Sequence, residues 1–300
     1  MVQTIRKAVR LGVGGLQPAR GWSSPPGCGR IEDMSDQQTW CNPVRARLQA
    51  GQPAFGVTIT TASVEAAAHA ATLGFHFLWI EMEHSPITLE TLRLMVLATR
   101  GRPAAVFARV PVVELWTAKR VLDQGVSGVI FPFAGTAEKA ARAAAACRYP
   151  PAGLRGSGAG AAVRTWPLPG NYYDSADQQV FTICVVEEAS ALDQIDAIAA
   201  TPGVDAIFIG TSDLSFSLGL RGKQNEPALE TAIARIAQAA GRHGKFLGRP
   251  AGTPEQVRRY MEQGFLLFQM PTEIGLMELG ARQLLEPLGI SGIPAAQRAV

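Results

Sequence analysis

From residue 42 onward the chain repeats one pattern of apolar and polar positions. Each repeat holds a short apolar run, too short for a helix, followed by a segment whose apolar residues recur at helical spacing. The short runs predict strands over residues 55–60, 77–81, 104–109, 128–133, 181–187, 204–210, 245–248 and 265–269. Because strand and helix alternate in this way eight times, we expect an α/β fold, a (β/α)8 or TIM barrel rather than an open sheet.

Capping residues support the helical half of the pattern. Predicted helices cover residues 63–71, 88–99, 114–123, 136–146, 190–200 and 253–264, with Ser63, Thr136 and Thr253 as helix-starting residues and Gly74, Gly125 and Gly264 as stops. Residues 149–177 are rich in Gly and Pro and predict one long loop, and a last helix and tail follow Glu273.

Residues 1–33 differ from the rest, being basic, rich in Gly and Pro and poor in acids. We interpret them as an upstream extension before Met34 or as an organellar transit segment, and exclude them from the fold. Residues 42–300 are then expected to form a single barrel domain. The expected location is cytoplasmic, and organellar only if residues 1–33 are a transit segment.

Composition excludes several classes of protein. A hydrophobic content of 47% in 300 residues predicts a large buried core. The net charge of +3 is too small to indicate a nucleic-acid partner. The four cysteines show no zinc-binding spacing and are expected to be reduced. No apolar run reaches the roughly 20 residues of a membrane-spanning helix, so no membrane association is expected.

Charged residues gather just beyond the predicted strands. Glu187 and Asp213 follow neighbouring strands, Arg109 closes an earlier one, and Glu81, Glu83 and His84 follow the second. In a barrel the carboxyl ends of all strands share one mouth, so we expect these side chains to converge.

That set of residues suits one kind of chemistry. Two carboxylates with positions left for water and substrate are a typical site for Mg²⁺ or Mn²⁺. An arginine beside them can bind a substrate carboxylate or an enolate, and a histidine can exchange protons near neutral pH. Together they predict metal-assisted chemistry at a carbon next to a carbonyl.

Each residue also has a structural interpretation. Glu187 and Asp213 could cap helices, Arg109 could belong to a buried ion pair, and His84 could be a loop histidine. Arg155 lies in a Gly-rich segment and could either bind an anion or have a purely structural role.

Four segments carry a family resemblance: FLWIEMEHSP (77–86), ARVP (108–111), RYPPAGLRG (148–156) and FIGTSDLS (208–215). In this order they closely resemble the metal-dependent pyruvate aldolases of the HpcH/HpaI type, over residues 42–285. The resemblance implies a barrel whose last helix packs on a neighbouring subunit, usually in a homo-hexamer. It also implies cleavage of a small 4-hydroxy-2-oxo acid to pyruvate and an aldehyde.

The resemblance assigns roles to individual residues. It implies that Glu187 and Asp213 bind the metal, Mg²⁺ or Mn²⁺ with Co²⁺ as a further candidate, that Arg109 contacts the pyruvate carboxylate and enolate oxygen, and that His84 is the acid/base. Asp123 falls where relatives have an aspartate that orients this histidine; since it ends a helix at the opposite face of its own barrel, it could act only from another subunit. Ser212 and Arg155 complete the candidate substrate contacts.

The chain departs from the family pattern near the site. Glu81 stands where Asp is usual, Val185 where Gln is common, and Thr211-Ser212 where Pro-Ala or Pro-Ser is usual. Residues 268–273 replace a small, Gly-containing stretch. These departures leave the substrate undetermined.

Three other functions are consistent with parts of this pattern. A Schiff-base aldolase needs a lysine in the mouth, and Lys245, which begins its strand, lies at the wrong face. A citrate-lyase-like enzyme acting on acyl-CoA would use the same metal site. A non-catalytic barrel serving as an assembly partner would need no metal.

Overall fold

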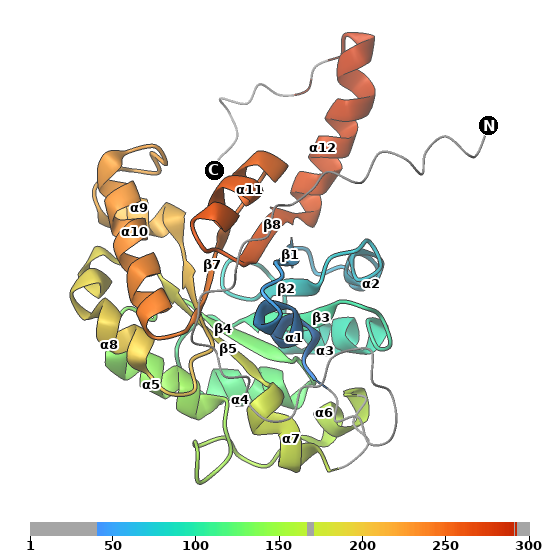
Figure 1. The fold of residues 1–300 in the computed structure, drawn as a ribbon. Coiled ribbons are helices and arrows are strands. Elements are labelled where there is room, and N and C mark those ends of the chain that lie inside the picture. Colours follow the sequence, from blue (N-terminus) through green and yellow to red (C-terminus); the bar gives the residue numbers. More distant parts are fainter. Residues whose placement is uncertain (1–40, 167–170, 291, 293–300) are drawn as a thin grey trace.

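The computed structural model describes residues 41–166, 171–290 and 292. Within these residues eight parallel strands pair in chain order, and the last closes on the first to form a barrel (Figure 1). The strands are β1 (Ala54–Ile59), β2 (Phe77–Glu81), β3 (Ala105–Arg109), β4 (Gly128–Phe131), β5 (Phe181–Val186), β6 (Ala206–Ile209), β7 (Phe246–Pro250) and β8 (Leu267–Thr272). The predicted (β/α)8 barrel is confirmed, whereas the prediction for residues 1–33 lies outside the described residues.

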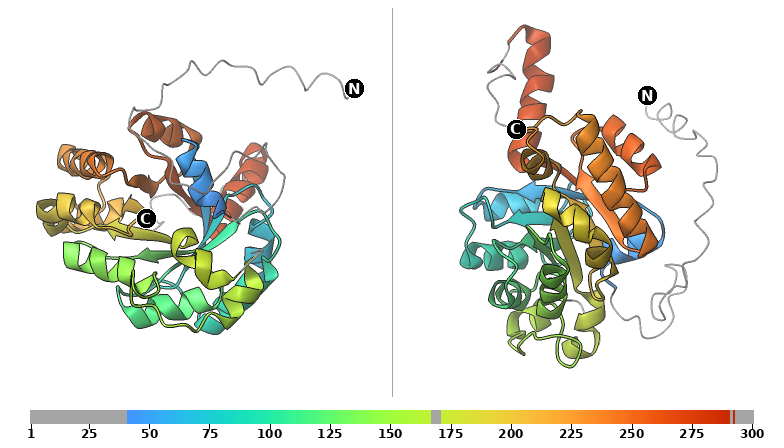
Figure 2. Two further views of the ribbon diagram at one scale, coloured as in Figure 1. Left: turned by 60° about the horizontal axis from the view of Figure 1, so that its bottom comes forward. Right: turned by 90° about the vertical axis from the view of Figure 1, so that its left-hand side faces the viewer.

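Helices surround the barrel (Figures 1 and 2). They are α1 (Pro43–Gln49), α2 (Val64–Ala70), α3 (Leu89–Ala98), α4 (Leu115–Asp123), α5 (Ala137–Ala146), α6 (Gly160–Thr165), α7 (Tyr172–Gln179), α8 (Ile195–Ala200), α9 (Thr211–Ser217), α10 (Pro227–Arg242), α11 (Pro254–Glu262) and α12 (Glu273–Leu285), with 3₁₀ turns η1 (Ala189–Gln194) and η2 (Glu286–Leu288).

The strands bury both faces, which explains their continuous apolar runs. In β2, Phe77 and Trp79 pack inside the barrel, whereas Leu78 and Ile80 pack between the barrel and the helices. This period of two follows from the pleat of a strand.

Three of the predicted helix starts and two of the predicted stops are confirmed. Ser63, Thr136 and Thr253 each accept a hydrogen bond from a backbone N–H of the first helical turn. Gly74 and Gly264 have φ of +99° and +92°, which L side chains rarely adopt.

Some predicted boundaries were wrong. The strand predicted over residues 128–133 ends at Phe131, because Phe133 has a φ of +49° that no strand permits. The last strand runs from Leu267 to Thr272 rather than over residues 265–269. It continues through Pro271 because the pairing with β1 shifts by one residue there, so that no ladder bond is required of the proline.

The predicted long loop contains two short helices, α6 and α7. Helix α6 packs on α4, and α7 ends at Gln179, which accepts a hydrogen bond from the Asn42 N–H just before α1. Because the two helices are short and lie in a Gly-rich segment, the sequence shows no clear helical periodicity there. Similarly, the helix predicted over residues 190–200 begins as the 3₁₀ turn η1.

Helix α12 projects away from the barrel (Figures 1 and 2). None of its residues is buried, although Met277 and Leu284 are apolar and 71% and 73% exposed. In the described part of the chain no helix is long and apolar enough to cross a membrane.

Candidate active site

The carboxyl ends of the strands surround a cavity of about 400 Å³. Arg109, Glu187, Ser212 and Asp213 line it, as the sequence predicted for strand ends that share one mouth. The structure therefore brings together both proposed metal ligands and two of the proposed substrate contacts.

Glu187 comes directly after β5 and is 2% exposed. Its Oε1 accepts a hydrogen bond from the backbone N–H of Phe133 at 2.7 Å. Gly210, at the end of β6, leaves room for the other oxygen, since a Cβ at this position would lie 2.3 Å from Oε2 of Glu187. A backbone donor and a missing side chain thus fix where this carboxylate lies.

The mouth holds more negative charge than its cations balance. Burial raises the pKa of Glu187 to about 7, with Asp213 adding to the effect and the Phe133 N–H opposing it. Burial also raises the pKa of Glu83 to about 7, opposed by Arg109 and increased by Glu81 and Asp213. Buried carboxylates of this kind favour a bound proton or a bound cation.

The Arg109 guanidinium forms ion pairs with two carboxylates. Its Nε lies 2.6 Å from Oε2 of Glu81, which the pairing of β2 with β3 places opposite it, and its Nη1 lies 3.1 Å from Oε2 of Glu83. Glu81 is itself fixed, because its Oε1 accepts from the backbone N–H groups of Glu83 and His84. In the described part of the chain neither ion pair uses Nη2.

His84 lies at the edge of this cluster. Its side chain is 62% exposed, and its Nε2 lies 3.6 Å from Oε1 of Glu83. The histidine therefore reaches the acidic cluster through Glu83.

Asp123 and Arg155 lie at the other end of the barrel. Arg155 is 1% exposed and pairs with Asp123 at 3.1 Å and with the Tyr172 hydroxyl at 2.9 Å. Within one chain neither residue reaches the cavity, because the end of α4 and the loop after α5 face the starts of the strands. Inside this chain Arg155 therefore pairs with groups of the fold, and the expected substrate contact of Arg155 stays a prediction. Asp123 could meet a site only on another subunit, as its position in the sequence implied.

Lys245 is also far from the mouth. Its ammonium donates to the carbonyl oxygens of Thr201 and Val204, which precede β6. This position agrees with the rejection of a Schiff-base mechanism.

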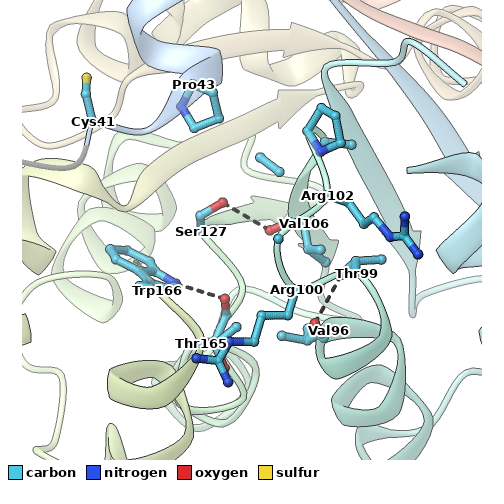
Figure 3. A pocket seen from close by; sticks show the side chains of 15 residues that line it. Cys41, Pro43, Val96, Thr99, Arg100, Arg102, Val106, Ser127, Thr165 and Trp166 are labelled. Carbon is cyan, nitrogen blue, oxygen red and sulfur yellow. Dashed lines mark hydrogen bonds between the residues drawn. The ribbon is translucent and has the colours of Figure 1, made fainter. Parts of the chain in front are cut away.

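A second cavity, of about 420 Å³, lies where the strands begin (Figure 3). Loops that precede β3 and β4 bound it, and Trp166 donates to the Gly125 carbonyl oxygen at 2.9 Å. Among the described residues that line it there is no Asp, Glu or His, although Arg100 and Arg102 are present. It offers no acid/base pair, so we assign the candidate site to the mouth.

The donors at the mouth fit a hard divalent cation. Glu187 and Asp213 supply carboxylate oxygens, and an absent Cβ at Gly210 makes room beside Glu187. In the described residues no group of three His, Cys, Asp or Glu side chains forms a metal cage. The set corresponds to the two-carboxylate arrangement expected from the sequence.

Fold and mouth together define a barrel protein with an acidic pocket at the carboxyl ends of its strands, the usual location of barrel active sites. The chain belongs to the HpcH/HpaI aldolase/citrate lyase family, whose pattern it matches over residues 55–277. The expected family is therefore confirmed.

Two relatives are named aldolases. The chain is 36% identical to the hydroxypyruvate/pyruvate aldolase of Paraburkholderia phytofirmans over 254 residues, covering 83% of this chain and 98% of that protein. It is 32% identical to the 5-keto-4-deoxy-D-glucarate aldolase of Klebsiella pneumoniae, covering 83% and 97%. A solved structure of a family protein from Burkholderia cenocepacia matches with a TM-score of 0.76 at 33% identity, over 83% of this chain and 100% of that one.

Sequence reasoning missed three contributors to the site. The Phe133 N–H that holds Glu187 belongs to the backbone, and no sequence pattern marks it. Arg249 and Arg259 also line the cavity. Arg249 could have been noticed as a charged residue at the end of an apolar strand.

Proposed function

We propose that this protein is a divalent-metal-dependent aldolase that cleaves a 4-hydroxy-2-oxo acid to pyruvate and an aldehyde. The observation that carries the proposal is that Glu187, Asp213 and Arg109 line one cavity at the carboxyl ends of the strands. Both named relatives are aldolases, which supports this reaction over acyl-CoA cleavage.

Glu187 and Asp213 would hold Mg²⁺ or Mn²⁺, with Co²⁺ as a further candidate. When bound, the cation supplies Lewis acidity next to the 2-oxo group. The raised pKa of Glu187, about 7, reflects the burial that a bound cation would offset.

Arg109 would bind the carboxylate of the oxo acid and stabilise the negative charge that develops as the carbon–carbon bond breaks. Its clamp by Glu81 and Glu83 fixes the guanidinium before substrate arrives. The N-terminal turn of α9 brings Ser212 to the same cavity as a hydroxyl contact.

His84 would take the proton from the 4-hydroxyl group, with Glu83 beside it. Bond cleavage leaves an electron pair on the carbon next to the oxo group, and return of one proton to this carbon completes pyruvate. An exposed histidine at the edge of the mouth can exchange that proton with water.

The test uses purified protein, a panel of 4-hydroxy-2-oxo acids and acyl-CoA thioesters, and assays for pyruvate, aldehyde and free CoA. We expect pyruvate and aldehyde with Mg²⁺ or Mn²⁺, loss of activity on chelation and recovery on metal addition. Full turnover after exhaustive chelation would contradict the metal proposal. Release of CoA without aldehyde would favour the citrate-lyase-like alternative, and absence of metal binding the assembly partner.

We also propose a homo-oligomer, a hexamer by the resemblance, in which α12 packs on a neighbour. Support comes from the unburied apolar side chains of α12 and of the turn η2 that follows it, including Met277, Leu284 and Leu288. In such an assembly Asp123 of one subunit could approach the mouth of another.

A further inference from the structure

The floor of the mouth cavity is formed by side chains that point into the barrel. Trp79, Val185 and Phe208 line the cavity and pack inside the barrel together with Leu267, so their part of the floor is apolar. Gln269 lines the cavity too and lies two residues after Leu267 on β8. Because side chains alternate between the two faces of a strand, Gln269 points into the barrel as Leu267 does. A polar amide therefore lies beside apolar side chains on the floor of the cavity.

A hydrogen bond fixes the orientation of the Gln269 amide. Its Nε2 donates to Oγ1 of Thr58 at 3.0 Å. Thr58 lies on β1, is 3% exposed and pairs with Trp79 on β2, which also packs inside the barrel. In the described part of the chain no N–H or O–H group donates to Oε1 of Gln269. The fold thus holds the amide by its nitrogen, and the carbonyl oxygen keeps its capacity to accept hydrogen bonds.

Gln269 faces the acidic side of the mouth from across the barrel. In the closed barrel β8 lies between β7 and β1, and therefore opposite β4. Arg109, Glu187 and Asp213 lie at or just beyond the ends of β3, β5 and β6, which are the strands around β4. These three residues and Gln269 line the same cavity. A substrate whose oxo-acid end is held at Arg109 and the two carboxylates therefore extends its other end towards β8.

The chemistry of an amide oxygen limits what this end of the substrate can be. A carbonyl oxygen accepts hydrogen bonds, and an apolar group packed against it would leave it unpaired when the cavity closes around the substrate, at a cost in free energy. A hydroxyl group is a donor that is compatible with an aldehyde, whereas an amino group condenses with one. Gln269 also belongs to residues 268–273, where the chain departs from the family pattern, so this contact is a property of the chain itself.

We propose that Gln269 is a specificity-determining residue whose Oε1 accepts a hydrogen bond from a hydroxyl group on the part of the substrate that is released as the aldehyde. This inference rests on the proposed function, which places the oxo-acid end at Glu187, Asp213 and Arg109. The substrate class is a 4-hydroxy-2-oxo acid with a further hydroxyl group beyond its fourth carbon.

The test measures aldol addition of pyruvate by the metal-loaded protein to propanal, 2-hydroxypropanal and 3-hydroxypropanal, which have the same chain length. We expect the wild type to favour one hydroxylated aldehyde over propanal in kcat/KM, and the aldehyde favoured shows which carbon carries the hydroxyl. Gln269→Met keeps the length of the side chain and removes the acceptor. It should reduce the preference by roughly 3- to 10-fold, the usual effect of losing one hydrogen bond between neutral groups.

Gln263→Met is the matched control. Gln263 follows the last residue of α11, is exposed and does not line the cavity. Its substitution should leave the preference unchanged. The proposal is overturned if the wild type favours neither hydroxylated aldehyde, or if Gln269→Met lowers kcat/KM equally for all of the aldehydes, as a purely structural role predicts.

A second comparison separates the two halves of the substrate. Pyruvate and hydroxypyruvate are each added to propanal by the wild type and by Gln269→Met. We expect the ratio of their kcat/KM values to be the same in both proteins, because Gln269 faces the aldehyde half. A ratio that changes for this pair, with an unchanged preference among the aldehydes, would place the contact on the oxo-acid half and overturn the proposal.

Thr58→Val is a second variant at the same contact. It keeps the shape of the buried side chain but removes the hydroxyl that orients the Gln269 amide, so it should lower the preference in the same direction as Gln269→Met. If Gln269→Met does not fold, as judged by its melting temperature, Thr58→Val decides the outcome. An unchanged preference in Thr58→Val would then overturn the proposal.

A binding measurement separates this inference from the proposed function. If no aldehyde reacts, the proposed function fails, and the metal-loaded protein is titrated calorimetrically with 2-oxohexanoate and with its 5-hydroxy and 6-hydroxy derivatives. These acids lack the 4-hydroxyl group and cannot be cleaved. Tighter binding of a hydroxylated acid that Gln269→Met abolishes supports the role of Gln269, whereas equal or absent binding overturns it.

Discussion

Glu187 shows how a single buried carboxylate can link metal binding to stability. Its folded-state pKa of about 7 is well above the ordinary value of 4.5. The folded, metal-free protein therefore keeps a proton that the unfolded chain has already released between these two pH values. The stabilising effect of that proton is complete below pH 4.5 and is lost as the pH rises through about 7.

We expect the melting temperature of chelated wild type to fall relative to Glu187→Gln as the pH rises from 5 to 7. The free energy of unfolding should change by at most about 1.4 kcal/mol per pH unit for one group. Differential scanning calorimetry of both proteins in chelator measures this. If the melting temperatures of the wild type and Glu187→Gln changed in parallel with pH, Glu187 would not titrate in this range. With Mn²⁺ present the wild type should have the higher melting temperature, because only the wild type has both proposed ligand carboxylates, Glu187 and Asp213.

We expect His84→Ala to lower kcat for cleavage by roughly 10² to 10⁴, the usual contribution of a general base. Metal affinity and melting temperature should change little, because the imidazole is 62% exposed. Steady-state kinetics from pH 6 to 9, beside a metal titration, measures this.

Glu83→Gln is the comparison variant, because the pKa of Glu83 is raised to about 7 and its carboxylate contacts the histidine. An unaffected kcat in His84→Ala, together with a large loss in Glu83→Gln, would make Glu83 the base. Loss of metal affinity in His84→Ala would make the histidine a ligand instead.

At the residue scale, the positions of Glu187, Asp213 and Arg109 could be predicted because strand ends in a barrel converge. Arg155 could not be placed, because the sequence does not show that its loop folds back on Asp123. Arg249 looked like part of a strand, and the packing of its guanidinium against Tyr260 depends on the position of α11.

At the scale of elements, the junction between β6 and α9 leaves room for the Glu187 side chain, because Gly210 there has no Cβ. Gly210→Ala would put a methyl carbon 2.3 Å from Oε2 and 2.8 Å from Cβ of Glu187. We expect a loss of metal affinity of tenfold or more, because the carboxylate must move while the strands keep their pairing. Isothermal titration with Mn²⁺ measures it.

Gly241→Ala on α10 is the matched control. A Cβ there meets nothing within 4 Å, and the residue is inside a helix. This substitution should leave metal affinity unchanged and raise stability by up to about 1 kcal/mol. Equal Mn²⁺ affinity of Gly210→Ala and Gly241→Ala would show that the missing side chain of Gly210 does not matter for metal binding.

Element type was predictable wherever capping residues and apolar period agreed, as at Ser63 and Thr253. Boundaries failed where tertiary contacts decided them. β4 stops because Phe133 turns to meet Glu187, and β8 passes through Pro271 because β1 shifts register. Neither cause is local in sequence.

At the scale of the whole molecule, α12 is the element without a partner. We expect Met277→Lys combined with Leu284→Lys to dissociate the oligomer while the barrel stays folded, because neither side chain is buried within the chain. Light scattering after size-exclusion chromatography measures the mass, and circular dichroism the fold.

Gln283→Lys, a charge added at an exposed polar position of the same helix, should leave the mass unchanged. A wild type that is already monomeric, or a double variant of unchanged mass, would exclude α12 as the contact. The sequence predicted this final helix, whereas its projection from the barrel depends on the three-dimensional course of the chain after β8.

The contact between Phe133 and Glu187 has a consequence for how this protein can be altered. The carboxylate is oriented by the amide of residue 133, while the side chain there is 40% exposed. The backbone conformation, with φ of +49°, is one that Gly or Asn adopts at lower cost than Phe. Position 133 can therefore tolerate replacement while its amide keeps holding Glu187. Libraries that reshape the rim for new aldehydes can begin at this residue.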